Sequence, residues 1–474
     1  MAKVLKWIVL VIIGLIVLLL AAVVAFLLIT GIPSNGAAMA AKGVCSAKFV
    51  ADRPGDAQTL FNEDILPASP AFKVISVEMD EGNRSVTGKF LGMFSRTATL
   101  HPNQGCVLDL PADSNAVPFQ TPAEDPAPWP RGDAVASDGL SDAGADEANL
   151  KKTLQAAMQQ SGDANGINAR GIAIAHNGKL VAREVGPGFE TNTPLHGWSM
   201  TKSVAATLFA MRAEETGLKP ETPVINAFPA DKTPSWVAEW SQDNRAQITV
   251  ADLLYMRSGL EMEESYQPWG QVVKMLYGEP DMASWAAGHP RYTDDETRFE
   301  YLSAVSNIIA QINQAHFASN EEYWQYTVDK LYKPLGIKTA TLETDTTGTQ
   351  VGSSFLWASI GDWTKLGQLF LNEGKWNGQQ VYPASWNPLL QASGKDSGEG
   401  HSYGAQIWHP AREGGSCASN PDVPKDTMSM EGHWGQVVAS IPSKNLVISR
   451  LGWTINKSDF DECKFLGDVA KEFK

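Results

Sequence analysis

The feature that most limits how this chain can fold is a strongly apolar segment close to its N-terminus. Residues 7–29 read WIVLVIIGLIVLLLAAVVAFLLI and include no charged side chain. As a helix rising about 1.5 Å per residue, the segment would span roughly 35 Å, which exceeds the hydrocarbon layer of about 30 Å. A core helix of this length would normally carry a polar face. The segment therefore predicts a transmembrane anchor.

The charges around this segment predict its orientation. Lys3 and Lys6 precede it, and the next cationic residue is Lys42. By the positive-inside rule, residues 1–6 form a cytoplasmic tip and everything after Thr30 is exported. The alternative is a cleaved signal peptide with a cleavage site at residues 38–40, but apolar regions of signal peptides are usually about 7–15 residues long and end near the cut. We expect a retained single-pass anchor and a periplasmic or otherwise extracytoplasmic domain.

The four cysteines agree with export. Cys45, Cys106, Cys417 and Cys463 all follow the anchor, and an even number of cysteines in an oxidising compartment permits two disulfides. Three connectivities are open. We prefer Cys45–Cys106 and Cys417–Cys463, because each pair would lie within one predicted structural unit.

Charge and residue spacing exclude several functions. The 474 residues include 53 Asp and Glu against 38 Lys and Arg, a net charge of −15. An acidic chain repels phosphate backbones, so we expect no nucleic-acid partner. The histidine and cysteine spacing does not suit a structural zinc site, and no P-loop or dinucleotide fingerprint is present. We expect no metal and no cofactor.

Composition and patterning divide the exported part into three regions. Residues 30–112 form a juxtamembrane segment and a small β-rich unit, in which FKVISVEMD and SVTGKFLGMF alternate as strands do around a turn at residues 81–83. Residues 113–148 are rich in Pro, Asp and Ala and predict a linker or a strap over the surface. The largest region, residues 149–474, predicts a mixed α/β domain.

Residues 149–474 contain two predicted hairpins and a long predicted helix. RGIAIAHNGKLVAREV predicts a hairpin turning at Asn177-Gly178, and QVVASIPSKNLVISRLGW predicts another turning at residues 443–445. The helix after Trp198 should end at Gly217, and residues 250–335 should be mostly helical. Strands at both ends of a domain with helices between them favour one antiparallel sheet, with its terminal strands adjacent, and a helical subdomain.

The most informative stretch is HGWSMTKSVAATLFAMRAEE, where Ser199 begins a helix and Lys202 follows three residues later. That spacing places both side chains on one helical face. A serine hydroxyl becomes a good nucleophile only when a neighbouring base removes its proton, and a lysine serves as that base only if its neutral form is stabilised. Alone, the pattern is weak, because a serine that caps a helix and a solvated lysine would give it too.

Further segments occur in a fixed order downstream: LLYMRSGLEMEESYQPW, FEYLSAVSNIIAQI, LYKPLGIKTATLETDTTG, DWTKLGQLFLNEGKWNGQQVYPASW and EGHWGQVVASIPSKNLVISRLG. Together with the Ser-x-x-Lys stretch they resemble the penicillin-recognising serine hydrolases, a family of class C β-lactamases, DD-peptidases and esterases. The resemblance covers about residues 149–474 and points to the branch typified by 6-aminohexanoate-dimer hydrolase. It implies an α+β fold of the β-lactamase/DD-peptidase type, with an antiparallel sheet flanked by helices and an α-helical subdomain.

The resemblance assigns catalytic roles to three residues. Ser199 matches the acylated nucleophile, Lys202 its proton acceptor, and Tyr301 the tyrosine that passes a proton to the leaving group. Ser303 stands where many members have asparagine, which leaves the usual amide contact in doubt. Tyr266 matches more loosely a tyrosine that contacts the scissile amide.

The third motif departs from the family pattern. His433-Trp434-Gly435 replaces the usual Lys-Thr-Gly, and the resemblance implies that the backbone N–H groups of Ser199 and Gln436 form the oxyanion hole. The usual lysine attracts a substrate carboxylate, whereas a histidine is mostly uncharged near neutral pH. We therefore expect an ester or amide substrate that lacks the required carboxylate, and little β-lactamase activity.

The sequence thus predicts a membrane-anchored serine hydrolase that acts on a small-molecule amide or ester through an acyl-enzyme. A cell-wall DD-peptidase or β-lactamase is one alternative. A non-catalytic binding domain on the same fold is another. The substrate, the role of residues 45–112 and the oligomeric state stay open.

Overall fold

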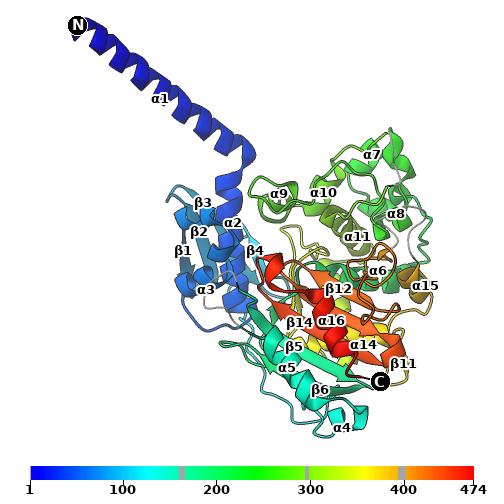
Figure 1. The fold of residues 1–474 in the computed structure, drawn as a ribbon. Helices are drawn as coiled ribbons and strands as arrows, with labels where there is room; N and C mark the ends of the chain where they lie inside the picture. Colours follow the sequence, from blue (N-terminus) through cyan, green and yellow to red (C-terminus); the bar gives the residue numbers. More distant parts are fainter. Residues whose placement is uncertain (1, 160–165, 294–297, 393–401, 474) are drawn as a thin grey trace.

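A computed structural model describes residues 2–159, 166–293, 298–392 and 402–473. Figure 1 shows a long N-terminal helix that projects from the rest of the molecule, a small unit at its base and a large domain beyond that unit. Helix α1 (Ala2–Thr30) exposes its apolar side chains and is long and apolar enough to cross a membrane. Gly31 then adopts a left-handed φ of 68°, which separates α1 from helix α2 (Ile32–Cys45).

The N-terminal unit is an antiparallel sheet with α2 packed across it. The sheet order is β1-β2-β3-β4, and the predicted turn connects β1 to β2. Gly88 on β2 allows a close helix–sheet approach, because a Cβ there would lie 2.2 Å from the carbonyl oxygen of Ala37. The elements of this unit are β1 (Ile75–Asp80), β2 (Ser85–Phe90), β3 (Phe94–His101), β4 (Gly105–Leu108) and α3 (Ala57–Asp64).

The large domain is built on a five-stranded antiparallel sheet in the order β12-β13-β14-β5-β6. Its terminal strands are adjacent, as predicted, because β14 pairs with β5 along their length. Both predicted hairpins form, and left-handed Asn177 and Gly178 make the first turn. The strands are β5 (Ala169–His176), β6 (Lys179–Val185), β12 (Met428–Gly432), β13 (Gln436–Ile441) and β14 (Leu446–Gly452).

Helices cover both faces of this sheet (Figure 1). Ile172 and Ile174 pack with α5 (Glu147–Ala157) and α16 (Glu462–Ala470), whereas Ala173 and Ala175 join the main core on the other face with α14 (Ile360–Leu371). This alternation along β5 follows from the two-residue period of a strand. A second sheet, β7-β9-β8, lies beside the main core and consists of β7 (Leu195–His196), β8 (Thr341–Leu342) and β9 (Leu356–Ala358).

The helical subdomain lies across from the N-terminal unit (Figure 1). Residues 250–335 are mostly helical, as predicted, and α6 (Thr201–Thr216) ends at left-handed Gly217. The helices of this region are α7 (Trp236–Trp240), α8 (Val250–Leu254), α9 (Gln271–Gly278), α10 (Met282–Ala287), α11 (Ser303–Ala315), α12 (Asn320–Thr327) and α13 (Lys333–Leu335). The remaining elements are α4 (Gly139–Ala143), β10 (Lys375–Trp376), β11 (Gln379–Gln380) and α15 (Trp386–Gln391).

Residues 113–148 run from the N-terminal unit, where the Phe119 N–H donates to the Phe49 carbonyl, onto the large domain. The Ala136 N–H donates to the Leu180 carbonyl on β6, and Lys338 forms an ion pair with Asp125. The Trp129 ring packs edge-on against Trp376. These contacts describe a strap that follows the domain surface.

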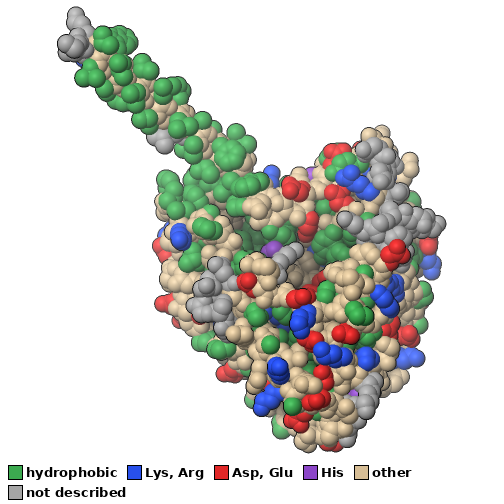
Figure 2. All heavy atoms as spheres, in the orientation of Figure 1, with side chains coloured by type: hydrophobic (Ala, Val, Ile, Leu, Met, Phe, Trp, Pro, Cys, Tyr) green, Lys and Arg blue, Asp and Glu red, His purple; other side chains and the backbone are tan. Residues whose placement is uncertain are grey.

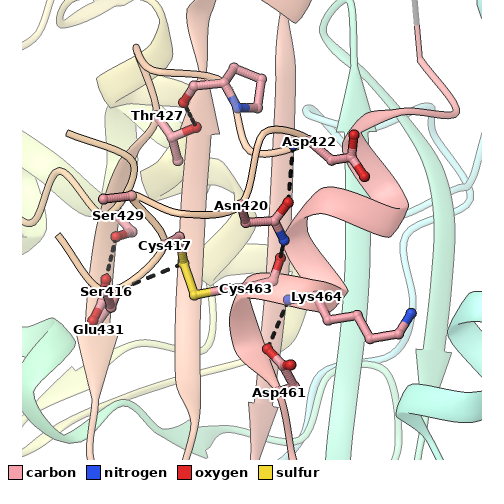
Figure 3. The surroundings of a disulfide bond; sticks show 12 residues. Ser416, Cys417, Asn420, Asp422, Thr427, Ser429, Glu431, Asp461, Cys463 and Lys464 are labelled. Carbon is pink, nitrogen blue, oxygen red and sulfur yellow. Dashed lines mark hydrogen bonds between the residues drawn. A yellow bond between two sulfur atoms is a disulfide. The ribbon is translucent and has the colours of Figure 1, made fainter. Parts of the chain in front are cut away.

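Two disulfides join the cysteines in the preferred pairs. Cys45 pairs with Cys106 inside the N-terminal unit, and Cys417 pairs with Cys463 at α16. Figure 3 shows the second bridge, where Asn420 also donates to the Cys463 carbonyl at 2.9 Å. Asp461 caps α16 by accepting from the Lys464 N–H. The bridge therefore fixes the loop around Cys417 to the start of the last helix.

We expect both disulfides to be present in the isolated protein and the second one to be stabilising. Alkylation without reductant should add no mass, because all four sulfurs are bonded. Replacing Cys417 and Cys463 together by Ser should lower the free energy of unfolding by up to about 4 kcal/mol, since the chain then loses a cross-link that restricts the unfolded state. Four alkylatable thiols in the unreduced protein would contradict this prediction.

Candidate active site

Ser199 lies in a one-turn 3-10 helix (Trp198–Met200) that leads directly into α6. Trp198, the residue before it, has a left-handed φ of 48°, a conformation that is costly for a large side chain and is often found at functional sites. The turn closes through the Met200 N–H, which donates to the Gly197 carbonyl. This local geometry places Ser199 at the N-terminal end of α6, on the wall of a large pocket.

Lys202 lies one helical turn further along the chain, and its side chain contacts that of Ser199. Its Nζ is 2.9 Å from the Ser199 Oγ, 2.9 Å from the Ser303 Oγ and 3.1 Å from the Ser353 carbonyl oxygen. The side chain is 1% exposed. Burial lowers the pKa of Lys202 to about 8, although the Glu264 carboxylate opposes the shift. The amine therefore loses its proton far more readily than an ordinary lysine does.

Tyr301 comes two residues before Ser303, the first residue of α11, and faces the same centre. Its ring centroid is 4.9 Å from the Lys202 Nζ, and the ring stacks on Trp408 at 5.3 Å. Burial raises the pKa of Tyr301 well above its usual value, with a contribution from neighbouring Tyr403, while a hydrogen bond with Ser199 opposes the shift. The phenol therefore keeps its proton near neutral pH and is placed to donate it.

A half-buried carboxylate, that of Glu264, holds Ser303 in position. The Ser303 hydroxyl donates to one oxygen of Glu264 at 2.5 Å, and the Ser303 N–H donates to the other at 2.7 Å. Ser303 thereby connects the Lys202 amine to Glu264 through its hydroxyl. The hydroxyl occupies the position where many family members have an amide, and the carboxylate supplies the acceptor that orients it.

The residues of the third motif form the turn between β12 and β13. The His433 ring stacks on Tyr266 at 4.3 Å with an angle of 14° between the planes. Gly432, just before this turn, lies against the turn that carries Ser199, and a Cβ there would be 2.3 Å from the Gly197 carbonyl oxygen. The Gln436 side chain is buried and bonds to backbone groups of His433 and Gly452.

The pocket above Ser199 has a volume of about 660 Å³ and opens in the hollow between the N-terminal unit and the helical subdomain (Figure 2). Six residues named in the sequence analysis line it: Ser199, Tyr266, Tyr301, His433, Trp434 and Gly435. Lys202, Ser303 and Gln436 are buried and do not line the pocket. The structure thus brings the three predicted catalytic side chains together.

Sequence reasoning did not single out several residues around this centre. Four carboxylates line the pocket, those of Glu263, Glu264, Glu431 and Glu462. Glu264 lies two residues before Tyr266, within the segment LLYMRSGLEMEESYQPW that carries part of the family resemblance. Its position in that segment is the sequence signal that could have identified it. In the described parts of the chain, no lysine or arginine lines the pocket and no cluster of His, Cys, Asp or Glu is suited to hold a metal ion.

The architecture defines the class of protein: an antiparallel sheet flanked by helices, with a pocket at the edge shared with a helical subdomain. The β-lactamase family model matches residues 151–457. The chain therefore belongs to the β-lactamase family of hydrolases, and the predicted resemblance and the β-lactamase-like fold are confirmed. No curated protein sequence matches the chain.

Solved structures share this fold. A putative β-lactamase from Bacteroides dorei gives a TM-score of 0.54 at 15% identity over 69% of this chain and 99% of its own. EstCE1, a hydrolase with promiscuous acyltransferase activity, gives 0.53 at 14% identity over 69% and 98%. A putative 6-aminohexanoate-dimer hydrolase from Bacillus anthracis gives 0.50 at 18% identity over 64% and 78%. At these identities the similarity concerns the fold alone.

We expect the reactivity of Ser199 to follow the protonation of Lys202. With a pKa of about 8, only about a tenth of the amine is neutral at pH 7, so labelling by a fluorophosphonate probe should accelerate as the pH rises through 8 and then level off. Glu264→Gln should move the midpoint to lower pH, because the carboxylate stabilises the ammonium form. The exposed neighbour Glu263 provides the control, and Glu263→Gln should leave the midpoint in place. A midpoint near 10 would contradict the assignment.

Proposed function

We propose that the protein is a serine hydrolase that cleaves an amide or ester bond through an acyl-enzyme. The observation that carries the proposal is the Lys202 amine, which is 2.9 Å from the Ser199 hydroxyl and has a pKa lowered to about 8. A neutral amine at that distance can accept the Ser199 proton, and this is the activation that a serine nucleophile requires.

Each group has one role in the proposed reaction. Ser199 Oγ attacks the substrate carbonyl and forms a new C–O bond while Lys202 accepts the hydroxyl proton. Tyr301 then delivers a proton to the departing nitrogen or oxygen, the C–N or C–O bond breaks, and the acyl group stays on Ser199. Water attacks this ester with the same groups acting in reverse, which releases the acid and restores the serine.

The developing oxyanion requires hydrogen-bond donors opposite Ser199. We assign this role to the backbone N–H groups of Ser199 and Gln436, as the family resemblance implies. The close contact between Gly432 and Gly197 supports a donor from the β12–β13 connection, because it brings this connection against the turn that carries Ser199. The bonded Gln436 side chain holds the start of β13 in place.

We further propose that α1 is a retained membrane anchor and that the rest of the chain is extracytoplasmic. The two disulfides support export. The alternative cleavage site at residues 38–40 lies inside α2, where Ala38 and Ala40 are fully buried. Cleavage there would remove half of the helix that covers the N-terminal sheet, so the packing favours the uncleaved form.

We expect Ser199→Ala and Lys202→Ala each to lower the turnover of a neutral p-nitrophenyl ester by about 10³-fold or more, since each removes a group that acts in both half-reactions. Exposed Ser114 and Lys219 provide matched controls, and Ser114→Ala and Lys219→Ala should retain wild-type turnover. Circular dichroism should show that all four variants fold. Intact activity in the Ser199→Ala variant would refute the proposed mechanism.

We expect anionic β-lactams to be poor substrates, because the pocket wall carries four carboxylates and His433 in place of the usual lysine. Nitrocefin turnover should be far below that of a neutral ester of similar size, and both rates can be measured spectrophotometrically in one buffer. Nitrocefin turnover at the level of class C enzymes, or stable labelling by a fluorescent penicillin, would instead favour the β-lactamase or DD-peptidase function.

A further inference from the structure

A second cavity of about 290 Å³ lies between the N-terminal unit and the large domain. Its walls come from both parts of the molecule and are mainly apolar. From the described chain, no Asp, Glu, Lys or Arg contributes to them. The aliphatic and aromatic side chains that define it include Ile32, Met39, Phe72, Ile75, Val273 and Ile455.

This cavity adjoins the pocket of Ser199. Tyr266, His433 and Trp434 line both spaces, so these three rings form a shared wall. Tyr266 and His433 are stacked on each other, with their ring centroids 4.3 Å apart. Displacement of the Tyr266 ring would join the apolar cavity to the catalytic pocket.

The other end of the cavity lies next to the base of α1. Ile32 lines the cavity and is separated from the end of α1, Thr30, by a single residue. Two residues of chain extend at most about 7 Å, so a bilayer crossed by α1 would have its surface beside the cavity.

The surface around this end is unusually apolar. Val74, Leu91 and Met93 on the N-terminal unit are 42%, 57% and 69% exposed, and Trp269 is 60% exposed beside the cavity residue Pro268. Figure 2 shows apolar side chains that continue from α1 onto the adjoining face of the unit. Exposed aliphatic side chains and a tryptophan at this level are typical of a surface in contact with the membrane interface.

We propose that this cavity binds the hydrocarbon chain of an amphiphile that enters from the bilayer, and that the chain belongs to the acyl half of the substrate. The proposal rests on the proposed function, because Ser199 is the group that receives the acyl chain. The substrate is then a long-chain amide or ester. Its leaving amine or alcohol occupies the acidic pocket, and hydrolysis returns that group and a free fatty acid.

The geometry favours a chain from the membrane over a solute from water. The cavity walls are mainly apolar and carry no charged side chain in the described chain, the cavity adjoins the base of the anchor at Ile32, and it borders rings that also line the pocket of Ser199. Each methylene of a hydrocarbon chain would gain from burial against the aliphatic and aromatic walls, whereas a charged solute would lose its hydration with no charged partner among the described lining residues.

A chain-length series tests the cavity. With the full-length protein in phosphatidylcholine nanodiscs, kcat/KM for p-nitrophenyl esters should rise by about fourfold per methylene from acetate to octanoate, until the cavity is filled. Ala68 lines the cavity, and Ala68→Trp should collapse the ratio of octanoate to acetate. Gln267→Trp, at an exposed cavity residue, gives a second test should the first variant not fold. Ala238→Trp, on the exposed face of α7, is the matched control and should keep the wild-type ratio.

The outcomes separate this inference from the proposed function. Suppose that Ser199→Ala loses all ester turnover while the wild-type protein gives a flat chain-length series. That result would retain the proposed hydrolase and overturn the acyl cavity. A wild-type protein that turns over no ester of the series would overturn both proposals. A steep series that Ala68→Trp and Gln267→Trp leave unchanged would place the chain elsewhere and overturn the assignment to this cavity.

The source of the chain has its own test. Replacing Met93 and Trp269 together by Ser should lower the turnover of a vesicle-embedded long-chain ester by at least about tenfold relative to the turnover of dissolved p-nitrophenyl octanoate. The reason is that the apolar rim of the cavity, to which these two side chains belong, no longer contacts the bilayer. An unchanged ratio between the two substrates would show that the chain does not enter through this rim and would overturn entry from the membrane.

Discussion

The burial of one amine governs the arrangement of the site. Lys202 lies where α6, the start of α11 and the segment before β9 meet, and its three hydrogen bonds go to Ser199, Ser303 and Ser353. Removing an ammonium from water is costly unless it is paired or its proton is lost. Burial lowers the pKa of the amine to about 8, although the Glu264 charge opposes the shift. The same close packing therefore places the Ser199 hydroxyl beside an amine with a lowered pKa, which is the arrangement that the proposed mechanism requires.

The N-terminal unit is bound tightly to the domain behind this site. Lys42 on α2 forms a buried ion pair with Glu343 at 2.9 Å, and Asp64 accepts from both Arg53 and Arg170. Burial raises the pKa of Asp64, but the two guanidinium groups outweigh it and hold that pKa below its usual range. Breaking such buried pairs leaves an uncompensated charge, which costs about 3–5 kcal/mol. The unit thus has a fixed position relative to the pocket and provides one wall of the apolar cavity.

The pocket wall is acidic, with four carboxylates and no lysine or arginine among its described lining residues. Carboxylates of Glu264 and Glu431 act on Tyr301, where they add to the effect of burial and raise its pKa. They help to keep the phenol protonated, and they oppose any substrate carboxylate near Ser199. Together with the apolar cavity, this arrangement suits an amphiphile whose bond to be cleaved lies between a hydrocarbon chain and a neutral or cationic head group.

Elements that depend on local pattern could be predicted from the amino acids alone. Residues 7–29 lack a polar face, Asn177-Gly178 favours a tight turn with left-handed residues, and Ser199 and Lys202 are one helical turn apart. The apolar helix, the first hairpin and the Ser199–Lys202 contact could therefore be predicted from short-range geometry. Which distant groups join these elements depends on how the whole chain folds. Glu264 reaches Ser303, and residues from α2 and β1 share a cavity with Tyr266 and His433, because loop paths and domain packing set these distances. Those long-range contacts leave no periodic signal in the chain.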